Sequence, residues 1–332
     1  MVLSRVLSFD DPSACQAIFP SADVEMFPTA GGSFHADVTQ IGINGIWLHR
    51  IHISLPEIDT VAVKPGRRLI GFLTECNSSS LLNGGLDVRP GDIVVNRSEV
   101  VHQRTDGDFH YGTVSLSSDR LDAAAEAIVG HGILEIPYKS IVRPSSTLML
   151  RLLNIHKSIG RLAHDNPDIL EFPEVSRALE NELTHVLVRC LDEGQSVQPT
   201  SSGRRHETIL TRFAEFLRAN PNRPLYVAEI CAAIGAAERT LRASCEEHLG
   251  MGPIRYLALR RMHLVRRALL RSDPHHLTVT QIATDHGFWE LGRFAVAYRT
   301  LFGESPSETL RQPSDRPALQ PVDLSFAATA QA

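Results

Sequence analysis

The spacing of hydrophobic residues divides the chain into regions of different character. Up to about residue 143 these residues occur in short β-branched or alternating runs, separated by Pro-Gly and Asn-Gly-Gly turns. Examples are GIWLHRIHISL, IDTVAVKPG, RRLIGFLTEC and DVRPGDIVVNRSEVVH. Short strands at regular spacing, with no helical period between them, favour an antiparallel sandwich or barrel. We therefore predict a β domain over residues 1–143.

From Ser145 the hydrophobic period becomes helical. One stripe consists of Leu148, Leu152, Ile155, Ile159 and Leu162, and a second consists of Val175, Leu179, Leu183, Val186, Leu187 and Leu191. They predict two helices over residues 144–192, arranged as an antiparallel pair. Residues 193–205 are polar and aperiodic, which predicts a flexible linker. Residues 206–312 are predicted to be helical and 313–332 to be a disordered tail, so the fold class is α+β.

The helical C-terminal region contains an internal repeat. VAEICAAIGAAERTLRASCEEHLGMGPIRYL aligns with VTQIATDHGFWELGRFAVAYRTLFGESPSETL, with one residue inserted after the turn glycine. The matched pairs are Val227 and Val279, Ile230 and Ile282, Gly235 and Gly287, Leu241 and Phe294, Cys245 and Tyr298, Gly250 and Gly303, and Pro253 and Pro306. Each copy predicts a short helix, a tight turn and a second helix that ends at Gly-x-x-Pro, which is the pattern of a helix-turn-helix.

Helix starts differ between the two copies. Thr278 and Gln281 form a T-x-x-Q capping box that predicts where the first helix of the second copy begins. The equivalent residue of the first copy is Tyr226, whose side chain cannot cap a helix. Between the copies, residues 253–273 predict one long helix with arginines at 255, 260, 261, 266, 267 and 271. Such a helix would hold two DNA-reading helices about one DNA turn apart, ~34 Å.

Charge is distributed unevenly along the chain. The whole protein has a formal charge of −5, but residues 204–312 contain 16 Arg, no Lys and 11 acidic residues, a net charge of +5. The remainder therefore carries −10, and an anionic partner is expected only for the C-terminal part. Five cysteines without CxxC spacing indicate reduced thiols. No apolar run approaches the ~20 residues of a membrane span, and acidic residues at positions 10 and 11 argue against a secretory signal.

Residues 204–311 resemble the AraC/XylS family of transcriptional regulators. The resemblance rests on RTL, LGMGPIRYL, RRMHLVRRALL, VTQIATDHGF and RFAVAYRTLFGESPSETL. It implies a cytoplasmic bacterial activator that contacts RNA polymerase, with a cupin-like effector-binding barrel at residues 1–143 followed by linker helices that form a homodimer. The family usually has Arg at the position of Ala243 and an aromatic residue at the position of Cys245. Both departures put the usual contact set in doubt.

The outward positions of the two second helices are the candidates for base reading. In the first copy Leu241 and Cys245 are expected to be buried, and in the second copy Phe294 and Tyr298. The residues expected to face the bases are Glu238, Arg239, Arg242, Ala243, Leu291, Gly292, Arg293 and Val296. Arg239 and Arg242 are the strongest candidates, since arginine can donate two hydrogen bonds to guanine.

Phosphate contacts are predicted for arginines outside the base-reading set. These are Arg255, Arg260, Arg261 and Arg299. We also expect Arg266→Ala to weaken binding to all DNA sequences alike.

A barrel fused to a DNA reader could hold a small effector in its interior. The candidates for effector contact are Trp47, His49, Arg50, Arg67, His102 and Arg104. The alternative function is a cupin-type metal-dependent enzyme with a helical appendage. His49 and His52 fall on opposite faces of one predicted strand, and His102 and His110 stand alone, so we predict no metal site, no cofactor and no enzymatic activity.

Overall fold

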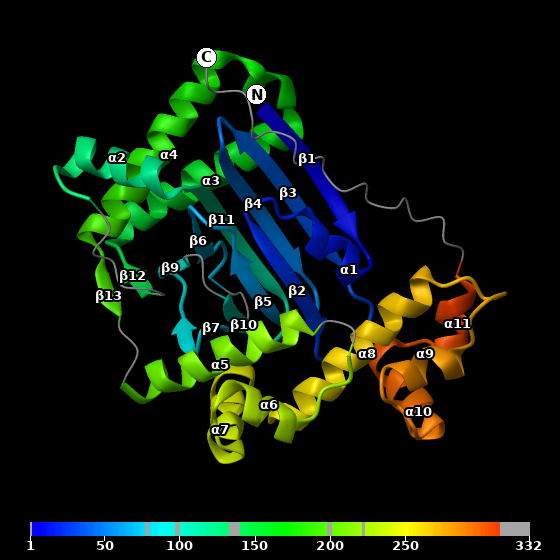
Figure 1. The fold of residues 1–332 in the computed structure, drawn as a ribbon. Helices are drawn as coiled ribbons and strands as arrows, with labels where there is room; N and C mark the ends of the chain where they lie inside the picture. Colours follow the sequence, from blue (N-terminus) through cyan, green and yellow to red (C-terminus); the bar gives the residue numbers. More distant parts are fainter. Residues whose placement is uncertain are drawn as a thin grey trace, which may run out of the picture. The chain divides into compact units, whose positions relative to one another are not determined.

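The computed structural model describes residues 2–76, 80–96, 100–132, 140–197, 201–220 and 223–312 (Figure 1). They belong to two compact units, Met1–Arg260 and Arg261–Ala332. The boundary falls inside helix α8 (Pro253–Arg271) and not in the predicted linker, so the domain limits derived from the sequence stay predictions. The predicted tail, 313–332, lies outside the described residues.

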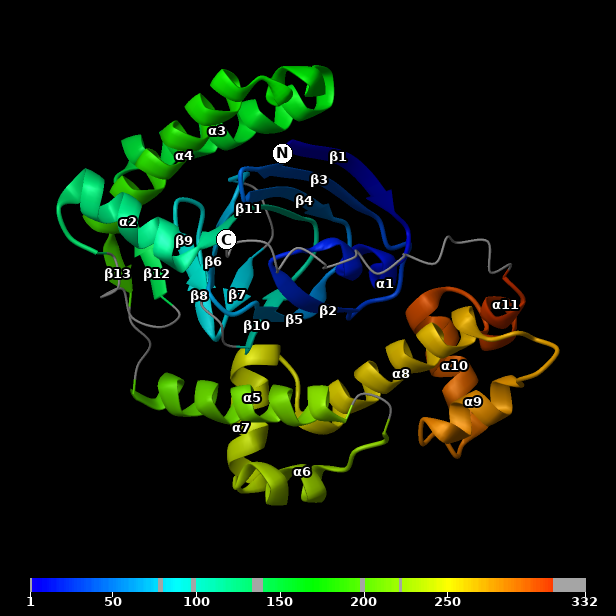
Figure 2. The same cartoon turned by 45° about the horizontal axis from the view of Figure 1, so that its top comes forward.

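Two antiparallel sheets form the β part of the first unit and face each other across an interior (Figure 2). The larger sheet has the spatial order β1 (Val2–Phe9), β3 (Ala36–Ile43), β4 (Ile46–Ile53), β11 (Phe109–Ser117), β6 (Arg67–Leu73), β9 (Ile93–Asn96), β12 (Ser140–Arg143) and β13 (Gln195–Val197). The smaller sheet has the order β2 (Ala22–Pro28), β5 (Glu57–Val63), β10 (Val100–Thr105), β7 (Leu81–Asn83) and β8 (Leu86–Val88). The predicted β domain is confirmed.

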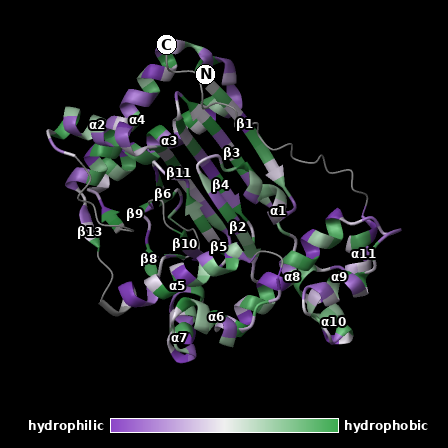
Figure 3. Cartoon of the chain, in the orientation of Figure 1, coloured by the Kyte–Doolittle hydropathy of each residue, from purple (hydrophilic) through white to green (hydrophobic). Residues whose placement is uncertain are grey.

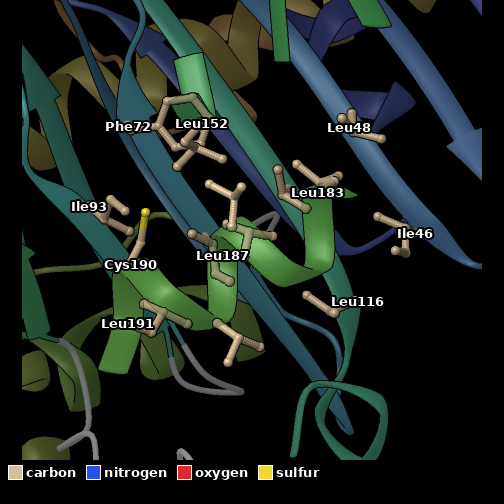
Figure 4. Close-up of a cluster of buried hydrophobic side chains, with 14 of the residues drawn as sticks. Ile46, Leu48, Phe72, Ile93, Leu116, Leu152, Leu183, Leu187, Cys190 and Leu191 are labelled. Atoms are coloured by element: carbon tan, nitrogen blue, oxygen red, sulfur yellow. The ribbon is translucent and has the colours of Figure 1, made fainter. Parts of the chain in front are cut away.

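Three helices cover the outer face of the larger sheet (Figure 2). They are α2 (Ser118–Val129), α3 (Ser146–Asp165) and α4 (Pro173–Glu193), with a 3-10 turn over Pro167–Glu171 between the last two. Leu152 of α3 and Leu187 of α4 are fully buried in one apolar cluster with Phe72 and Leu48 of the sheet (Figure 4). Each such leucine contributes about 1.5–3 kcal/mol through burial. Both predicted helical stripes are confirmed.

Helix α2 was not predicted, since the sequence was interpreted as strands without helical periods up to residue 143. Ser117 caps it by accepting a hydrogen bond from the Arg120 N–H, and Gly130 ends it in the left-handed conformation, with φ of 82°. Leu121 and Ala125 are its fully buried residues, and Ala124, Ile128 and Val129 are partly buried against the same core. Such a short apolar stripe is easily overlooked among neighbouring strands. Figure 3 shows the resulting mixture of hydrophilic and hydrophobic residues along α2, α3 and α4.

A short helix, α1 (Pro12–Cys15), precedes β2, and α5 (Ser201–Ala219) precedes the predicted repeat. The first copy of the repeat forms α6 (Val227–Ile234) and α7 (Glu238–Leu249), followed by the beginning of α8. In the second unit the rest of α8 is followed by α9 (Val279–Asp285), α10 (Leu291–Phe302) and α11 (Pro306–Arg311). Part of the predicted linker has regular structure, because β13 pairs with β12 and α5 begins at Ser201.

The five cysteines form no disulfide; Cys15, Cys190 and Cys245 are buried, and Cys76 is exposed. Among the described helices, none combines the length and the hydropathy required to cross a membrane.

Candidate functional site

The first helix-turn-helix consists of α6 and α7. Gly235 adopts φ of 65° at the end of α6, a conformation that glycine reaches without steric cost, and α7 starts three residues later. Leu241 and Cys245 of α7 are fully buried in a cluster with Phe213 of α5. This packing leaves the opposite side of α7 exposed to solvent.

The exposed side of α7 carries the predicted base-reading residues. Glu238, Arg239 and Arg242 are exposed and Ala243 is half-buried. Arg242 Nη2 lies 3.4 Å from Glu238 Oε1, an i to i+4 ion pair on the helix surface. Surface pairs of this kind contribute little to stability, so the guanidinium can exchange this partner for another acceptor. The arrangement presents two arginine side chains from one turn of α7.

The second helix-turn-helix consists of α9 and α10. The predicted capping box is present: Thr278 Oγ1 accepts from the Gln281 N–H, and Gln281 Oε1 accepts from the Thr278 N–H at 2.9 Å. Phe294 and Tyr298 are buried, and the Tyr298 hydroxyl donates to Thr309 Oγ1 at 2.9 Å. Both cores therefore follow the predicted stripes.

The outward side of α10 is less polar than that of α7. Gly292, Arg293 and Val296 are exposed and Leu291 is half-buried. Arg293 Nη1 pairs with Glu290 Oε2 at 2.7 Å. Trp289, which precedes α10, is 71% exposed and was not among the predicted contacts. The sequence places this tryptophan in the turn between the two helices of the second copy, outside its buried stripe, which was the available signal.

The interior of the β part contains a cavity of about 60 Å³. Its walls are mainly apolar, with Phe19, Phe109 and Tyr111 as aromatic members and Val24, Ile51 and Val61 among the aliphatic ones. The polar side chains of the wall include His49, Asp59 and Gln103. Apolar walls with a few polar groups are typical of small-molecule sites.

His49 is held neutral in this cavity. Gln40 Nε2 lies 3.2 Å from His49 Nε2, and His49 Nδ1 lies 3.1 Å from Thr113 Oγ1. Since the Gln40 nitrogen can only donate, His49 Nε2 accepts and Nδ1 carries the proton. Burial lowers the pKa of His49 to about 3, with the nearby His156 adding a smaller effect.

Two carboxyl groups are buried next to each other at this cavity, and Asp59 is the one that lines it. Glu57 and Asp59 are alternate residues of β5 and point to the same side of the strand. Glu57 is 0% exposed and Asp59 is 6% exposed. Both Glu57 oxygens and Asp59 Oδ1 have no hydrogen-bond donor among the residues that the structure describes. Burial raises the pKa of Asp59 to about 7, and burial together with the Asp59 charge raises the pKa of Glu57 well above its ordinary value.

Residues 230–312 match the helix-turn-helix domain family. The C-terminal part of the chain contains a helix-turn-helix domain. The same part of the chain is similar to operon regulators and activators, and we refer to residues 204–312 as the AraC-type domain because of the resemblance described above. Over 103 residues the chain is 42% identical to the probable thc operon regulatory protein of Rhodococcus erythropolis, a match that covers 31% of each protein. Over 154 residues it is 36% identical to the XylDLEGF operon transcriptional activator of Pseudomonas putida, which covers 46% of this chain and 47% of the activator.

These matches span about a third to a half of the length of the two relatives. Among solved structures, that of the AraC-like transcriptional activator CuxR shares 15% sequence identity, with a TM-score of 0.43. The similarity covers 85% of this chain and all of CuxR.

Two arginines of helix α8, Arg260 and Arg266, were expected to contact DNA, but their guanidinium groups are bound within the protein. Arg260 is only 2% exposed; its Nη2 donates to the Leu217 carbonyl at 3.1 Å and lies 3.9 Å from Glu25 Oε1. The predicted phosphate contact of Arg260 is therefore not available in this structure. Arg266 Nη1 donates to Glu304 Oε1 at 2.5 Å, and its guanidinium lies 4.8 Å from the centre of the Phe302 ring. Arg266 thus stabilises the second compact unit of the chain through an internal ion pair. The sequence did not indicate this role.

The other predicted phosphate contacts lie nearer the surface. Arg255 and Arg299 are exposed. Arg261 is half-buried, with its guanidinium 5.3 Å from the centre of the Phe288 ring.

Only one of the predicted effector contacts, His49, lines the cavity. Arg50 faces outward against Gly160 of α3, and His102 faces outward with its ring 6.2 Å from that of Tyr256. Arg104 also faces outward, next to Gly250 in the AraC-type domain. These three side chains therefore do not line the cavity, contrary to the expected inward orientation, because the sequence did not indicate which face of each strand was internal.

The other two predicted effector contacts are engaged elsewhere. Trp47 packs over Gly42, and Arg67 donates to the Ser115 carbonyl at 2.9 Å. Asp59, Gln103 and Tyr111 were missed. The signal available was the alternation of β5, which places two acids beside valines on one face.

His110 does not stand alone, contrary to the sequence analysis. It lies directly opposite His52 on the neighbouring strand, with ring centres 4.4 Å apart. His52 Nε2 lies 2.7 Å from Asp108 Oδ1, and one ligand atom from each of His52, Asp108 and His110 falls within 4.8 Å of the others. Because Asp108 already forms ion pairs with both histidines, we assign no metal to this exposed group.

Proposed function

We propose that the chain is a sequence-specific transcriptional regulator in which the AraC-type domain binds promoter DNA and the barrel binds a small effector. The observation that carries this proposal is the duplicated helix-turn-helix, each copy with a packed inner stripe and an exposed outer side on its second helix. The names of the relatives, an operon regulatory protein and an operon activator, support the same function.

In this proposal the base contacts come from the outward sides of α7 and α10. They are Glu238, Arg239, Arg242, Ala243, Leu291, Gly292, Arg293 and Val296. Arg255, Arg261 and Arg299 would contact phosphates, whereas Arg260 is removed from this set because it is buried. Exposed arginine on α7 and exposed valine on α10 favour hydrogen-bonded reading by the first copy and contact with thymine methyl groups by the second.

The partners of the whole protein are part of the same proposal. We propose that it acts in the cytoplasm, as an activator that contacts RNA polymerase and forms a homodimer through α3 and α4. Support for the dimer surface is a groove between the two helices, lined by Leu150 and Ile155 of α3 and Leu179 of α4, in which Leu150 is 60% exposed. A contiguous exposed apolar surface is typical of protein contacts.

The enzyme alternative finds less support. His49 is the one histidine of the cavity wall, and it is occupied by Gln40 and Thr113. A cupin-type metal centre needs several imidazole and carboxylate ligands at one point.

A gel-shift titration on the DNA that flanks the protein's own gene tests the proposal. We expect a discrete complex that unrelated DNA of equal length competes away only at large excess. The double variant Arg239→Ala/Arg242→Ala should lose this preference, whereas Arg177→Ala on α4, an exposed arginine of the β unit, should keep it. Equal binding to flanking and unrelated DNA by the unaltered protein would contradict the proposal.

A further inference from the structure

One wall of the cavity carries a carboxyl group that has no basic partner. Asp59 lines the cavity and Glu57 is buried beside it. Apart from a proton held between the two carboxyl groups, both Glu57 oxygens and Asp59 Oδ1 have no hydrogen-bond donor within the described chain. Buried carboxyl groups in proteins are normally hydrogen-bonded or paired with a cation, because burying an uncompensated charge is costly. Among the described residues, the side chains that line the cavity include no lysine or arginine, and His49 is neutral. Once Asp59 ionises, a positive charge at this wall would therefore have to come from a ligand.

When ionised, the Glu57–Asp59 pair carries a net charge close to −1. Two carboxyl groups in contact do not both ionise readily, so the first proton leaves while the second stays shared between them. Burial and the Asp59 charge keep the proton on Glu57, and Asp59 then carries the charge into the cavity. A ligand that completes this site is a monocation able to donate hydrogen bonds.

Cavity size limits the rest of the ligand. A volume of about 60 Å³ has room for roughly five water molecules, at about 10–15 Å³ for each. This corresponds to a six-membered ring or a short branched chain with a one-carbon arm. The aromatic rings of Phe19, Phe109 and Tyr111 suit such an apolar body.

We propose that the cavity binds a small, mainly apolar primary amine as its ammonium ion, with Asp59, backed by the buried Glu57, as the anionic end of the site and the aromatic wall around the apolar end. This inference rests on the proposed effector-binding function of the barrel. A carboxylate ligand of the same size is disfavoured, because it would bring a second negative charge to Asp59.

Isothermal titration calorimetry of the full chain at pH 8 tests the inference with benzylamine, isopentylamine, benzyl alcohol and benzoate. We expect an amine to bind at least tenfold more tightly than benzyl alcohol, and benzoate to bind more weakly than the alcohol. Asp59→Asn should remove the preference for the amine, since the amide keeps the shape of the carboxyl group without its charge. The control Asp87→Asn, which changes an exposed carboxylate on β8, should retain it.

The affinity for the amine should also rise from pH 6 to pH 8, by up to about tenfold. The groups that face Asp59 are Glu57, Cys15, His49 and Tyr111. Burial raises the pKa of Cys15 and of Tyr111 above their ordinary values, and His49 stays neutral over this range. Asp59 is therefore the group that gains charge, and a simple amine, with a pKa near that of lysine, remains protonated throughout.

Three results would overturn the inference: benzyl alcohol or benzoate binding as tightly as the amines, unchanged amine binding by Asp59→Asn, or no binding of either amine to the folded protein. The gel shift on flanking DNA is independent of these results. Failure of DNA binding would contradict the regulator proposal, whereas failure of amine binding with intact DNA binding would contradict only the ligand class.

Discussion

Arg242 and Arg260 show how far residue-level prediction reaches. Arg242 lies on α7 and Arg260 on α8, the helix that follows it. The two arginines differ in their position relative to the buried side of their helix. Arg242 lies outside the buried stripe of Leu241 and Cys245, on its flank, so its exposure follows from the period. Arg260 lies at a buried position because the Leu217 carbonyl and Glu25, from distant segments, provide its partners. Long-range partners of this kind are not visible in a local pattern.

Substitution of Arg242 should alter which DNA sequence is preferred. If its guanidinium donates to one guanine, Arg242→Ala removes about 1–3 kcal/mol of discrimination at that base pair. Arg255→Ala, at an exposed position of α8, should instead weaken all sequences by a similar factor. Fluorescence anisotropy with the preferred site and its single-base variants measures both. A uniform loss for Arg242→Ala would mean that this arginine contacts phosphate.

Asp59 should make the stability of the barrel depend on pH. In the unfolded chain its pKa is about 3.9, whereas in the folded protein burial raises it to about 7. Between these values the folded protein keeps a proton that the unfolded chain releases, so stability falls as pH rises from about 4 to 7. Asp59→Asn removes this loss, and its free energy of unfolding should exceed that of the parent by up to about 4 kcal/mol at pH 8.

Urea unfolding at pH 5 and pH 8 measures this effect through the fluorescence of Trp47. A Trp289→Phe background makes Trp47 the sole tryptophan, since the chain has two. The control Asp87→Asn should show no change in the difference between the two pH values. If the free energy of unfolding changed equally between pH 5 and pH 8 in Asp59→Asn and in its parent, the raised pKa of Asp59 in the folded protein would be contradicted.

At the scale of elements the sequence was most informative where the pattern was repeated. The starts of α8 and α11 at prolines, the ends of α7 and α10 at glycines, and the capping box of α9 were all predicted and are confirmed. These features are local, because they depend on residues within four positions of one another. Helix α2 and the internal faces of the strands were not predicted, since they are decided by tertiary packing.

The unequal caps of the two repeats give a prediction for helix stability. Tyr226 precedes α6 without a side-chain cap and is 55% exposed, and the third residue of that helix is Glu229. Tyr226→Thr would create a T-x-x-E box and should stabilise α6 by about 1 kcal/mol. Thr278→Ala should destabilise α9 by a similar amount. Hydrogen exchange of the backbone amides measures each change, with slower exchange expected in α6 of Tyr226→Thr and faster exchange in α9 of Thr278→Ala. Exchange rates equal to those of the parent in both variants would show that the caps contribute nothing.

At the scale of the whole molecule the charge distribution determines how DNA affinity responds to salt. The exposed arginines include Arg239, Arg242, Arg255, Arg293 and Arg299. If about four of them replace counterions, log K should fall against log salt with a slope of about −4. Affinity should then decrease roughly 10²-fold between 50 and 200 mM salt. Anisotropy titrations over this range measure the slope, and a flat response would contradict the phosphate contacts.

Strand β5 offers a physical connection between the proposed ligand site and the first helix-turn-helix, so binding at the two sites can be coupled. Its inward residues Asp59 and Val61 line the cavity, whereas Ile58 packs with α5–α8 residues and Thr60 Oγ1 lies 3.5 Å from the Tyr256 hydroxyl. One strand thus forms both the wall of the proposed ligand site and a support of the first DNA-reading copy. Any factor by which bound amine changes DNA affinity must equal the factor by which bound DNA changes amine affinity. Calorimetry of the amine with and without DNA would therefore report the regulatory strength of the protein in the absence of polymerase.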